Sequence, residues 1–223
     1  TISSLSTISS NAFSSIDGQY SLTINSKSIV ENSYAGVTKR ISTIFPRTKS
    51  IRFSSAVEKI GSYAFANCVD LKSVDLNNVT VVNTGAFTGC SALKSIDLKQ
   101  VSTDENVNPG NLDTIRISST NTISITSPNA KHLIFSSNIS TFPYNFFKRD
   151  VHYAVDRVTF ENTNGVDIPP YAFYGISGNN FYFDNLKTVE GKIKTVGERA
   201  FYWYKYNLYR NRHTASQRLI YVS

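Results

Sequence analysis

The chain has 223 residues, of which 40% are hydrophobic, 13% aromatic and 17% charged. This composition excludes a disordered chain, because it can bury enough apolar surface to offset the entropy lost on folding. No apolar run reaches the roughly 18 residues that a membrane-spanning helix needs. The formal net charge is +7, and residues 187–218 supply most of it with eight basic and two acidic residues. Since the sequence contains no Met, we expect it to be a segment of a longer protein.

Short apolar segments at a regular spacing predict β-strands along the whole chain. In the clearest copies, the strand ends 11 residues after the Phe of an Ala-Phe pair. The same spacing from Ala12-Phe13, Phe146 and Ala172-Phe173 locates further strands, with small insertions or deletions. In chain order, the predicted strands cover residues 22–24, 51–53, 74–76, 96–98, 115–117, 133–135, 157–160, 181–183 and 219–222.

An internal repeat dominates the middle of the chain. Residues 60–76 align with residues 82–98, and the Ala-Phe pair, a Cys, Leu-Lys-Ser and Asp-Leu recur 22 residues later. A unit of this length cannot bury its own apolar face, so the units must stack and share one core. Side chains alternate along a strand, which places Val74 and Leu76 inward and Asp75 outward. Nine such strands predict a curved rod.

The pattern at residues 60–98 resembles the BspA-type leucine-rich repeat, whose unit reads Ile-Gly-x-x-Ala-Phe-x-x-Cys-x-x-Leu-x-x-Ile-x-Leu. The resemblance implies a leucine-rich-repeat solenoid of about nine coils, with short parallel strands on one face and helical or irregular turns on the other. It extends to residues 8–24 and 168–183 and is degenerate at 99–135. We expect residues 1–223 to form a single BspA-like domain with a C-terminal capping segment at about 199–223. A right-handed β-helix is the alternative architecture.

The two cysteines occupy equivalent positions in adjacent repeats. We expect Cys68 and Cys90 to be small buried thiols that remain reduced. Side chains stacked in parallel keep their Cβ atoms about 5 Å apart, which exceeds the usual separation of about 3.5 to 4.5 Å in a disulfide. His132, His152 and His213 are scattered, and no metal-ligand spacing is present.

Two outward carboxylates raise the question of catalysis. Asp75 and Asp97 should lie about 5 Å apart, which is the separation of the carboxyl groups in a retaining glycosidase. The repeat spacing explains this distance, and Arg52 and Arg116 on the next strands predict a charge-balanced ladder Arg-Asp-Asp-Arg. No nucleophile elbow, phosphate loop or metalloprotease motif is present. We therefore predict a non-catalytic protein without a cofactor.

The outward strand positions form the first candidate binding surface, since repeat proteins use such extended faces for recognition. A second candidate is the segment 201–213, where aromatic and basic residues alternate. It fits a cap over the end of the core, and its aromatic and cationic groups also fit a glycan. The candidate binding residues are Arg52, Asp75, Asp97, Arg116, Thr159, Tyr182, Trp203, Lys205, Arg210 and Arg212.

The family resemblance implies a secreted or surface-anchored protein that adheres to host matrix or to other cells. We expect its partner to be an extracellular matrix or cell-surface protein. The alternative is a glycan or glycosaminoglycan bound by the aromatic and basic C-terminal segment. We expect a monomer without nucleic-acid partners, because no recognised nucleic-acid-binding module is present.

Overall fold

The computed structural model describes residues 20–25, 47–101, 107, 112–118, 125, 129–147, 153–173, 175–176, 179–180, 183–201, 204–207, 212–215 and 221–222. In this part of the chain, short strands dominate and the helical element is one 3-10 turn, η2 (Tyr144–Phe146). The strands are β1 (Tyr20–Ile24), β2 (Thr48–Phe53), β3 (Lys59–Ile60), β4 (Ser73–Asp75), β5 (Val81–Val82), β6 (Ser95–Asp97), β7 (Thr114–Ile117), β8 (His132–Phe135), β9 (Arg157–Phe160), β10 (Val166–Ile168), β11 (Gly175–Ile176), β12 (Asn179–Asn180), β13 (Thr188–Glu190), β14 (Ile193–Val196), β15 (Tyr204–Asn207), β16 (Arg212–Ala215) and β17 (Tyr221–Val222).

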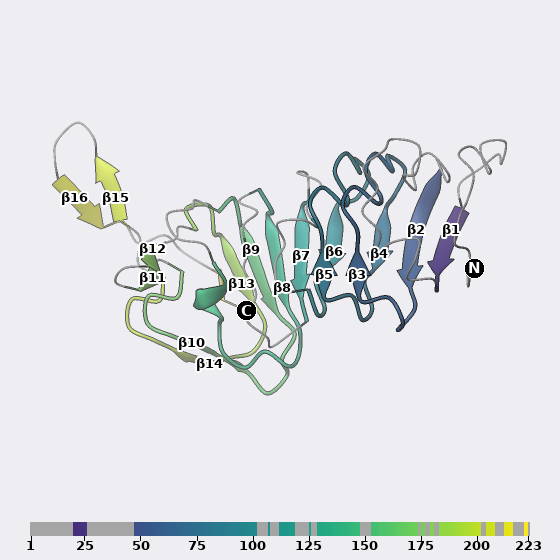
Figure 1. Cartoon of the computed structure of the whole chain (residues 1–223). Coiled ribbons are helices and arrows are strands. Elements are labelled where there is room, and N and C mark those ends of the chain that lie inside the picture. The colour runs from purple at the N-terminus through teal and green to yellow at the C-terminus, as the bar shows by residue number, and fades with distance from the viewer. Residues whose placement is uncertain are drawn as a thin grey trace.

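Two parallel sheets run along the molecule and contain most of the predicted strands. One has the order β1-β2-β4 and the other β17-β13-β9-β8-β7-β6. Strands from successive repeats therefore lie side by side, and Figure 1 shows them following one another along an elongated body. The register aligns the inward residues, for example Ile51 with Val74, and Ile115 with Leu133. Parallel strands on one face are thus confirmed, whereas the returning segments in the described residues combine turns with further short strands and almost no helix.

The 22-residue repeat is visible on the returning side as well. β3 pairs with β5 in parallel, and the partners Lys59 and Val81 are 22 residues apart. Farther along the chain β10 pairs with β14 in the same sense. Two antiparallel pairs, β11 with β12 and β15 with β16, lie outside this pattern. The predicted C-terminal insertion therefore contains the hairpin β15–β16, which Figure 1 shows at the end of the molecule far from β1.

A tight turn explains the Ala-Phe motif. The residue before each described Ala-Phe pair has a positive φ: 58° at Tyr63, 65° at Gly85, 55° at Tyr171 and 53° at Arg199. The Ala N–H then donates to the carbonyl three residues earlier, as Ala64 does to Gly61 at 3.3 Å. This arrangement is typical of a type II turn, in which the third residue has a positive φ. The turn places Ala against the neighbouring repeat and directs Phe into the core.

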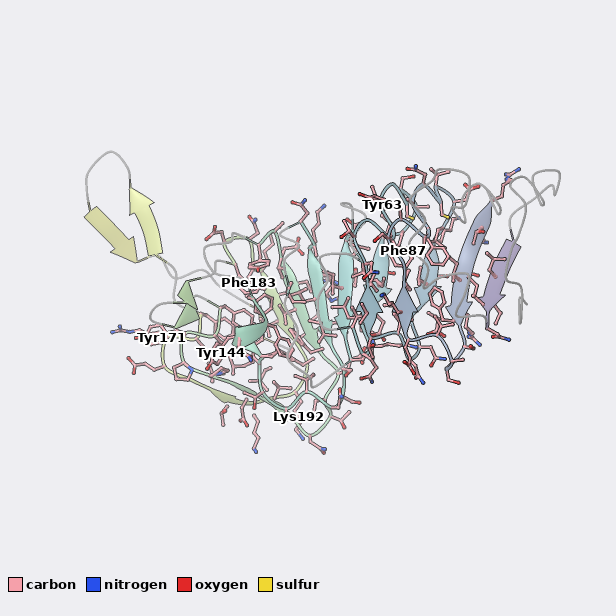
Figure 2. The ribbon with its side chains drawn as sticks, viewed as in Figure 1. Tyr63, Phe87, Tyr144, Tyr171, Phe183 and Lys192 are labelled. Carbon is pink, nitrogen blue, oxygen red and sulfur yellow. The ribbon has the colours of Figure 1, made fainter. Side chains whose placement is uncertain are left out.

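Aromatic side chains fill the interior from repeat to repeat. Phe65 and Phe87 are fully buried and stack with ring centroids 5.5 Å apart. Figure 2 shows Phe87 inside the molecule and Tyr63 at its margin. A second cluster lies toward the C-terminal half, where Phe142 contacts Phe173 with centroids 4.4 Å apart and Phe183 packs against both.

The cysteines are buried as predicted. Cys68 and Cys90 are at most 1% exposed and both thiols are free. The Cys90 thiol donates a hydrogen bond to the Phe65 carbonyl at 3.2 Å. The neighbouring Cys90 thiol and burial together raise the pKa of Cys68 well above its usual value. Cys68 therefore stays protonated at neutral pH and behaves as a core residue.

One strand lies at a different place in the structure from the one that the sequence predicts. The spacing from Ala172-Phe173 predicts a strand at residues 181–183 beside β9, but the strand that pairs with β9 is β13, Thr188–Glu190. Phe183 is fully buried and belongs to no strand, and residues 181 and 182 lie outside the described residues. The repeat here is longer than the motif suggests, so Glu190 rather than Tyr182 takes the outward position next to Thr159.

Removing one ring from the aromatic stack should destabilise the whole array. We expect Phe87→Ala to lower the free energy of unfolding by about 3 to 5 kcal/mol, because the cavity adds to the lost burial. Chemical denaturation followed by circular dichroism measures the change. Val69→Ala is the matched control, since Val69 is 51% exposed and its truncation should cost less than about 0.5 kcal/mol. Equal losses in the two variants would contradict a core shared between repeats.

Candidate binding face

The strand register brings outward side chains into continuous rows. We define the strand face as the outward side of the strands in the two parallel sheets. One row contains Thr23, Arg52 and Asp75 on the three-stranded sheet. It continues on the other sheet with Asp97, Arg116, Ile134, Thr159 and Glu190. Five of the sequence-predicted residues, Arg52, Asp75, Asp97, Arg116 and Thr159, therefore share this row.

Asp75 is held as a carboxylate by two cations from different repeats. Arg52 Nε lies 3.3 Å from Asp75 Oδ2, and Lys99 Nζ donates to Asp75 Oδ1. The Asn77 backbone N–H also donates to Oδ1 at 3.2 Å. The hydrogen bond from Lys99 is the main cause that holds the pKa of Asp75 below its ordinary value. Asp75 is thus an ionised structural group.

Asp97 and Arg116 form the other half of the predicted ladder. Arg116 Nε lies 3.3 Å from Asp97 Oδ2, to which Ser118 Oγ donates at 2.9 Å. The same guanidinium binds Glu161 through two parallel hydrogen bonds. This bidentate pair lowers the pKa of Glu161 and raises that of Arg116. The predicted pairing of each Asp with the Arg on the next strand is confirmed, and Glu161 extends it.

A third cluster lies toward the C-terminal end of the row. Thr159 Oγ1 donates to Glu190 Oε2 at 3.0 Å and lies 2.8 Å from His132 Nε2. Thr159 has one hydroxyl proton and donates it to Glu190, so its oxygen accepts the hydrogen bond from His132. His132 Nε2 therefore carries a proton and is the donor. Arg157 Nε lies 3.8 Å from Glu190 Oε1. Burial first, and then the charge of Arg157, lower the pKa of His132, so its ring is neutral at pH 7.

The remaining sequence-predicted residues do not join this row among the described residues. Tyr182, Trp203 and Arg210 lie outside the described residues. Lys205 and Arg212 belong to β15 and β16, where Lys205 pairs with Thr214 and Asn207 with Arg212. The register places positions 205 and 212 on the same face of the hairpin, because cross-strand partners share a face.

Sequence reasoning missed several residues that complete the charge clusters. They are His132, Arg157 and Glu190 at the C-terminal end of the row, Lys99 after β6 and Glu161 after β9. Lys99 had a usable sequence signal, because it follows Asp97 by two residues as Asn77 follows Asp75. In the structure, Lys99 and Asn77 both have a positive φ. Glu161 had none, since its partner Arg116 is 45 residues away.

The bidentate pair on the strand face gives a prediction for acid conditions. We expect Arg116→Gln to raise the pKa of Glu161 toward the ordinary value of about 4.3, as measured by NMR titration of the side-chain carboxyl. In the intact protein the pKa of Glu161 is lower in the folded state than in the unfolded state. The stabilisation that its pair with Arg116 contributes is therefore complete above about pH 4.3 and is lost as the pH falls through the folded-state pKa. Because Glu161 is partly exposed, the gain should be below about 1 kcal/mol. An unchanged Glu161 titration would refute the pairing.

The chain is similar to one solved structure and matches one family of repeat proteins. A crystal structure of a leucine-rich repeat protein from Bacteroides ovatus ATCC 8483 is 22% identical over 69% of this chain and 46% of that protein, with a TM-score of 0.25. The chain thus spans less than half of that protein's length. No curated protein matches the sequence. Residues 6–153 match the BspA type leucine-rich repeat region in six copies, and the chain therefore belongs to the BspA-type leucine-rich repeat family.

Proposed function

We propose that this protein is a non-catalytic adhesin-like protein, secreted or held at the cell surface, whose strand face binds a protein of the host matrix or of another cell. In this proposal residues 1–223 form one monomeric solenoid domain of about nine coils, capped by the segment at about 199–223. Two parallel sheets of three and six strands support the solenoid, and the BspA-type repeat supports the surface role. None of the described helices is long and apolar enough to cross a membrane.

The observation that carries the proposal is the fixed arrangement of charges on the strand face. Arg52, Asp75 and Lys99 hold one another in place, as do Asp97, Arg116 and Glu161. Side chains that are already ordered lose little entropy when a partner binds. Charged groups at fixed positions also select partners of complementary pattern and speed their association.

The same contacts make Asp75 and Asp97 unsuitable as a catalytic pair. A retaining glycosidase needs one carboxylic acid whose pKa is raised, so that it stays protonated beside the ionised nucleophile. The pKa of Asp75 is lowered, and Asp97 accepts hydrogen bonds from Ser118 and the Lys99 backbone N–H. Among the described residues, no group of three His, Cys, Asp or Glu side chains could hold a metal ion. We propose no cofactor and no nucleic-acid partner.

A second candidate function is glycan binding by the C-terminal segment through Trp203, Lys205, Arg210 and Arg212. The observation in its favour is the hairpin β15–β16, whose register places positions 205 and 212 on one face. An aromatic and two or more cations on one hairpin would suit a charged sugar. Neutralising Lys205, Arg210 and Arg212 together tests this candidate through the loss of heparin retention.

The protein-binding proposal predicts that partner capture depends on the strand face. We expect Arg52→Ala/Arg157→Ala to reduce the capture of extracellular matrix proteins by the immobilised chain at least about fivefold, since both arginine side chains are more than half exposed. Quantitative mass spectrometry of the eluted proteins measures capture. Lys192→Ala/Lys194→Ala is the control, because it removes two exposed cations next to or within β14, away from the strand face. Equal capture by the two variants and the wild type would rule out the strand face as the binding site.

A further inference from the structure

A Lys-Ser pair stands at the same position in three successive repeats. The pairs are Lys49-Ser50, Lys72-Ser73 and Lys94-Ser95. Ser50 is the register partner of Ser73, and the Lys72 N–H donates to the Lys49 carbonyl at 2.8 Å. Lys94 and Ser95 follow 22 residues later at the start of β6. Three lysines and three serines thus form two adjacent columns, the lysine–serine rows, along one margin of the strand face.

The three lysines and two of the serines are exposed and have no partners within the described part of the chain. Lys49, Lys72 and Lys94 are all exposed, and none forms an ion pair with a described residue. The nearby carboxylate of Asp70 lies 3.8 Å from Arg47. The exposed hydroxyls of Ser73 and Ser95 likewise have no described hydrogen-bond partner, whereas Ser50 donates to Ser21 at 2.6 Å.

The same position is charge-balanced in the later repeats. It is occupied by Asp113, Lys131, Asp156 and Lys187, and the backbone N–H of each residue from Lys131 onward donates to the carbonyl of the one before. Lys187 Nζ also lies 3.8 Å from Asp156 Oδ2. Acids and bases therefore alternate beyond β6, whereas three like charges stand in β2 and directly before β4 and β6. Like charges in neighbouring positions repel one another, and a bound anion would relieve this repulsion.

We propose that the lysine–serine rows bind a linear sulfated polysaccharide. The paired strands β2 and β4 lie about 4.8 Å apart, and the Ala92 N–H donates to the Val69 carbonyl at 3.3 Å, which holds the next repeat alongside. The three ammonium groups therefore follow one another from repeat to repeat along a line that one extended chain can follow. A sulfate group accepts hydrogen bonds from a lysine and from the neighbouring serine hydroxyl. The small serines leave room for a sugar ring to approach the sheet. One isolated anion would satisfy a single lysine, whereas a chain with sulfates on successive sugars engages all three.

The surroundings favour a glycan over a nucleic acid. Proteins that bind single-stranded nucleic acids stack the bases on aromatic side chains. The described positions of the outward row next to the serines, from Thr23 to Glu190, carry no aromatic residue. Asp75 and Asp97 in that row are already neutralised by Arg52, Lys99 and Arg116, so they repel a polyanion only weakly. This site is separate from the C-terminal hairpin and does not rest on the protein-binding proposal.

A heparin octasaccharide binding to the full chain tests the site by titration calorimetry at several salt concentrations. We expect Lys49→Gln/Lys72→Gln/Lys94→Gln to weaken binding about tenfold or more and to reduce the slope of log K against log salt by about two to three, since each contact releases counterions. The control Lys59→Gln/Lys192→Gln/Lys194→Gln removes the same charge from the segments around β3 and β14 (Figure 2 labels Lys192), and it should change the affinity less than about threefold. Equal losses in both variants would overturn the site.

Two further measurements locate the ligand on the lysine–serine rows. In the unmutated chain, the octasaccharide should protect Lys49, Lys72 and Lys94 from acetylation, as read by mass spectrometry, and unchanged labelling there would overturn the inference. Relative to the unmutated chain, Ser73→Ala/Ser95→Ala should weaken octasaccharide binding about two- to fivefold, because hydrogen bonds to the sulfates are lost. Loss of binding only on neutralising Lys205, Arg210 and Arg212 would assign the glycan to the C-terminal hairpin instead.

The ligand class is tested by competition. Polyglutamate and a single-stranded oligonucleotide of matched charge should compete at least about tenfold less well than the octasaccharide, because neither presents sulfates on a rigid sugar chain. Equal competition by either would overturn the assignment to sulfated polysaccharides. Failure of the octasaccharide to bind would also overturn it, while leaving the dependence of protein capture on Arg52 and Arg157 intact.

Discussion

The described repeats of this protein depend on one another for hydrogen bonds and for an apolar interior. The turn before each Ala-Phe pair illustrates this, because the Phe65 N–H reaches the Ala86 carbonyl at 2.8 Å and the Phe173 N–H reaches that of Ala200 at 3.0 Å. Asparagines after the strands act in the same way, since the amides of Asn77 and Asn162 donate to carbonyls 24 and 23 residues earlier. A single repeat has neither set of partners, so its sequence can specify a structure only within the stack.

This dependence explains the role of the charges beside the most regular repeats of the sequence. β4 and β6 belong to different sheets, so the continuous strand ladder is interrupted between them. Lys99 spans the interruption, because its ammonium group binds Asp75 while its backbone N–H donates to Asp97. The ion pairs on the strand face therefore connect repeats as well as display charge, which is why the side chains there are ordered before any partner arrives.

Much of this arrangement could be predicted from periodicity alone. Strands with two apolar inward residues, such as 51–53, 74–76 and 133–135, are located correctly because only one register buries both residues. The strand after Ala172-Phe173 was misplaced because an extended loop with its own buried Phe183 imitates the expected apolar triplet. In the site, the Arg–Asp pairs followed from adjacent strand positions, whereas Glu161 and Glu190 required the lengths of irregular segments that carry no periodic signal.

The charge pattern also divides the strand face into two chemically different halves. From β7 onward, acids and bases alternate before the strands, and Thr159 of the outward row forms hydrogen bonds with Glu190 and with His132 beside the row. From β2 to β6 the outward row is balanced, but the adjacent lysines are not. A repeat protein can vary outward residues without disturbing the core, because inward and outward positions alternate along each strand. The presence of Lys-Ser in three consecutive repeats, where the later ones differ, is therefore a property of the surface, and it separates a region able to attract anions from one whose charges are already paired.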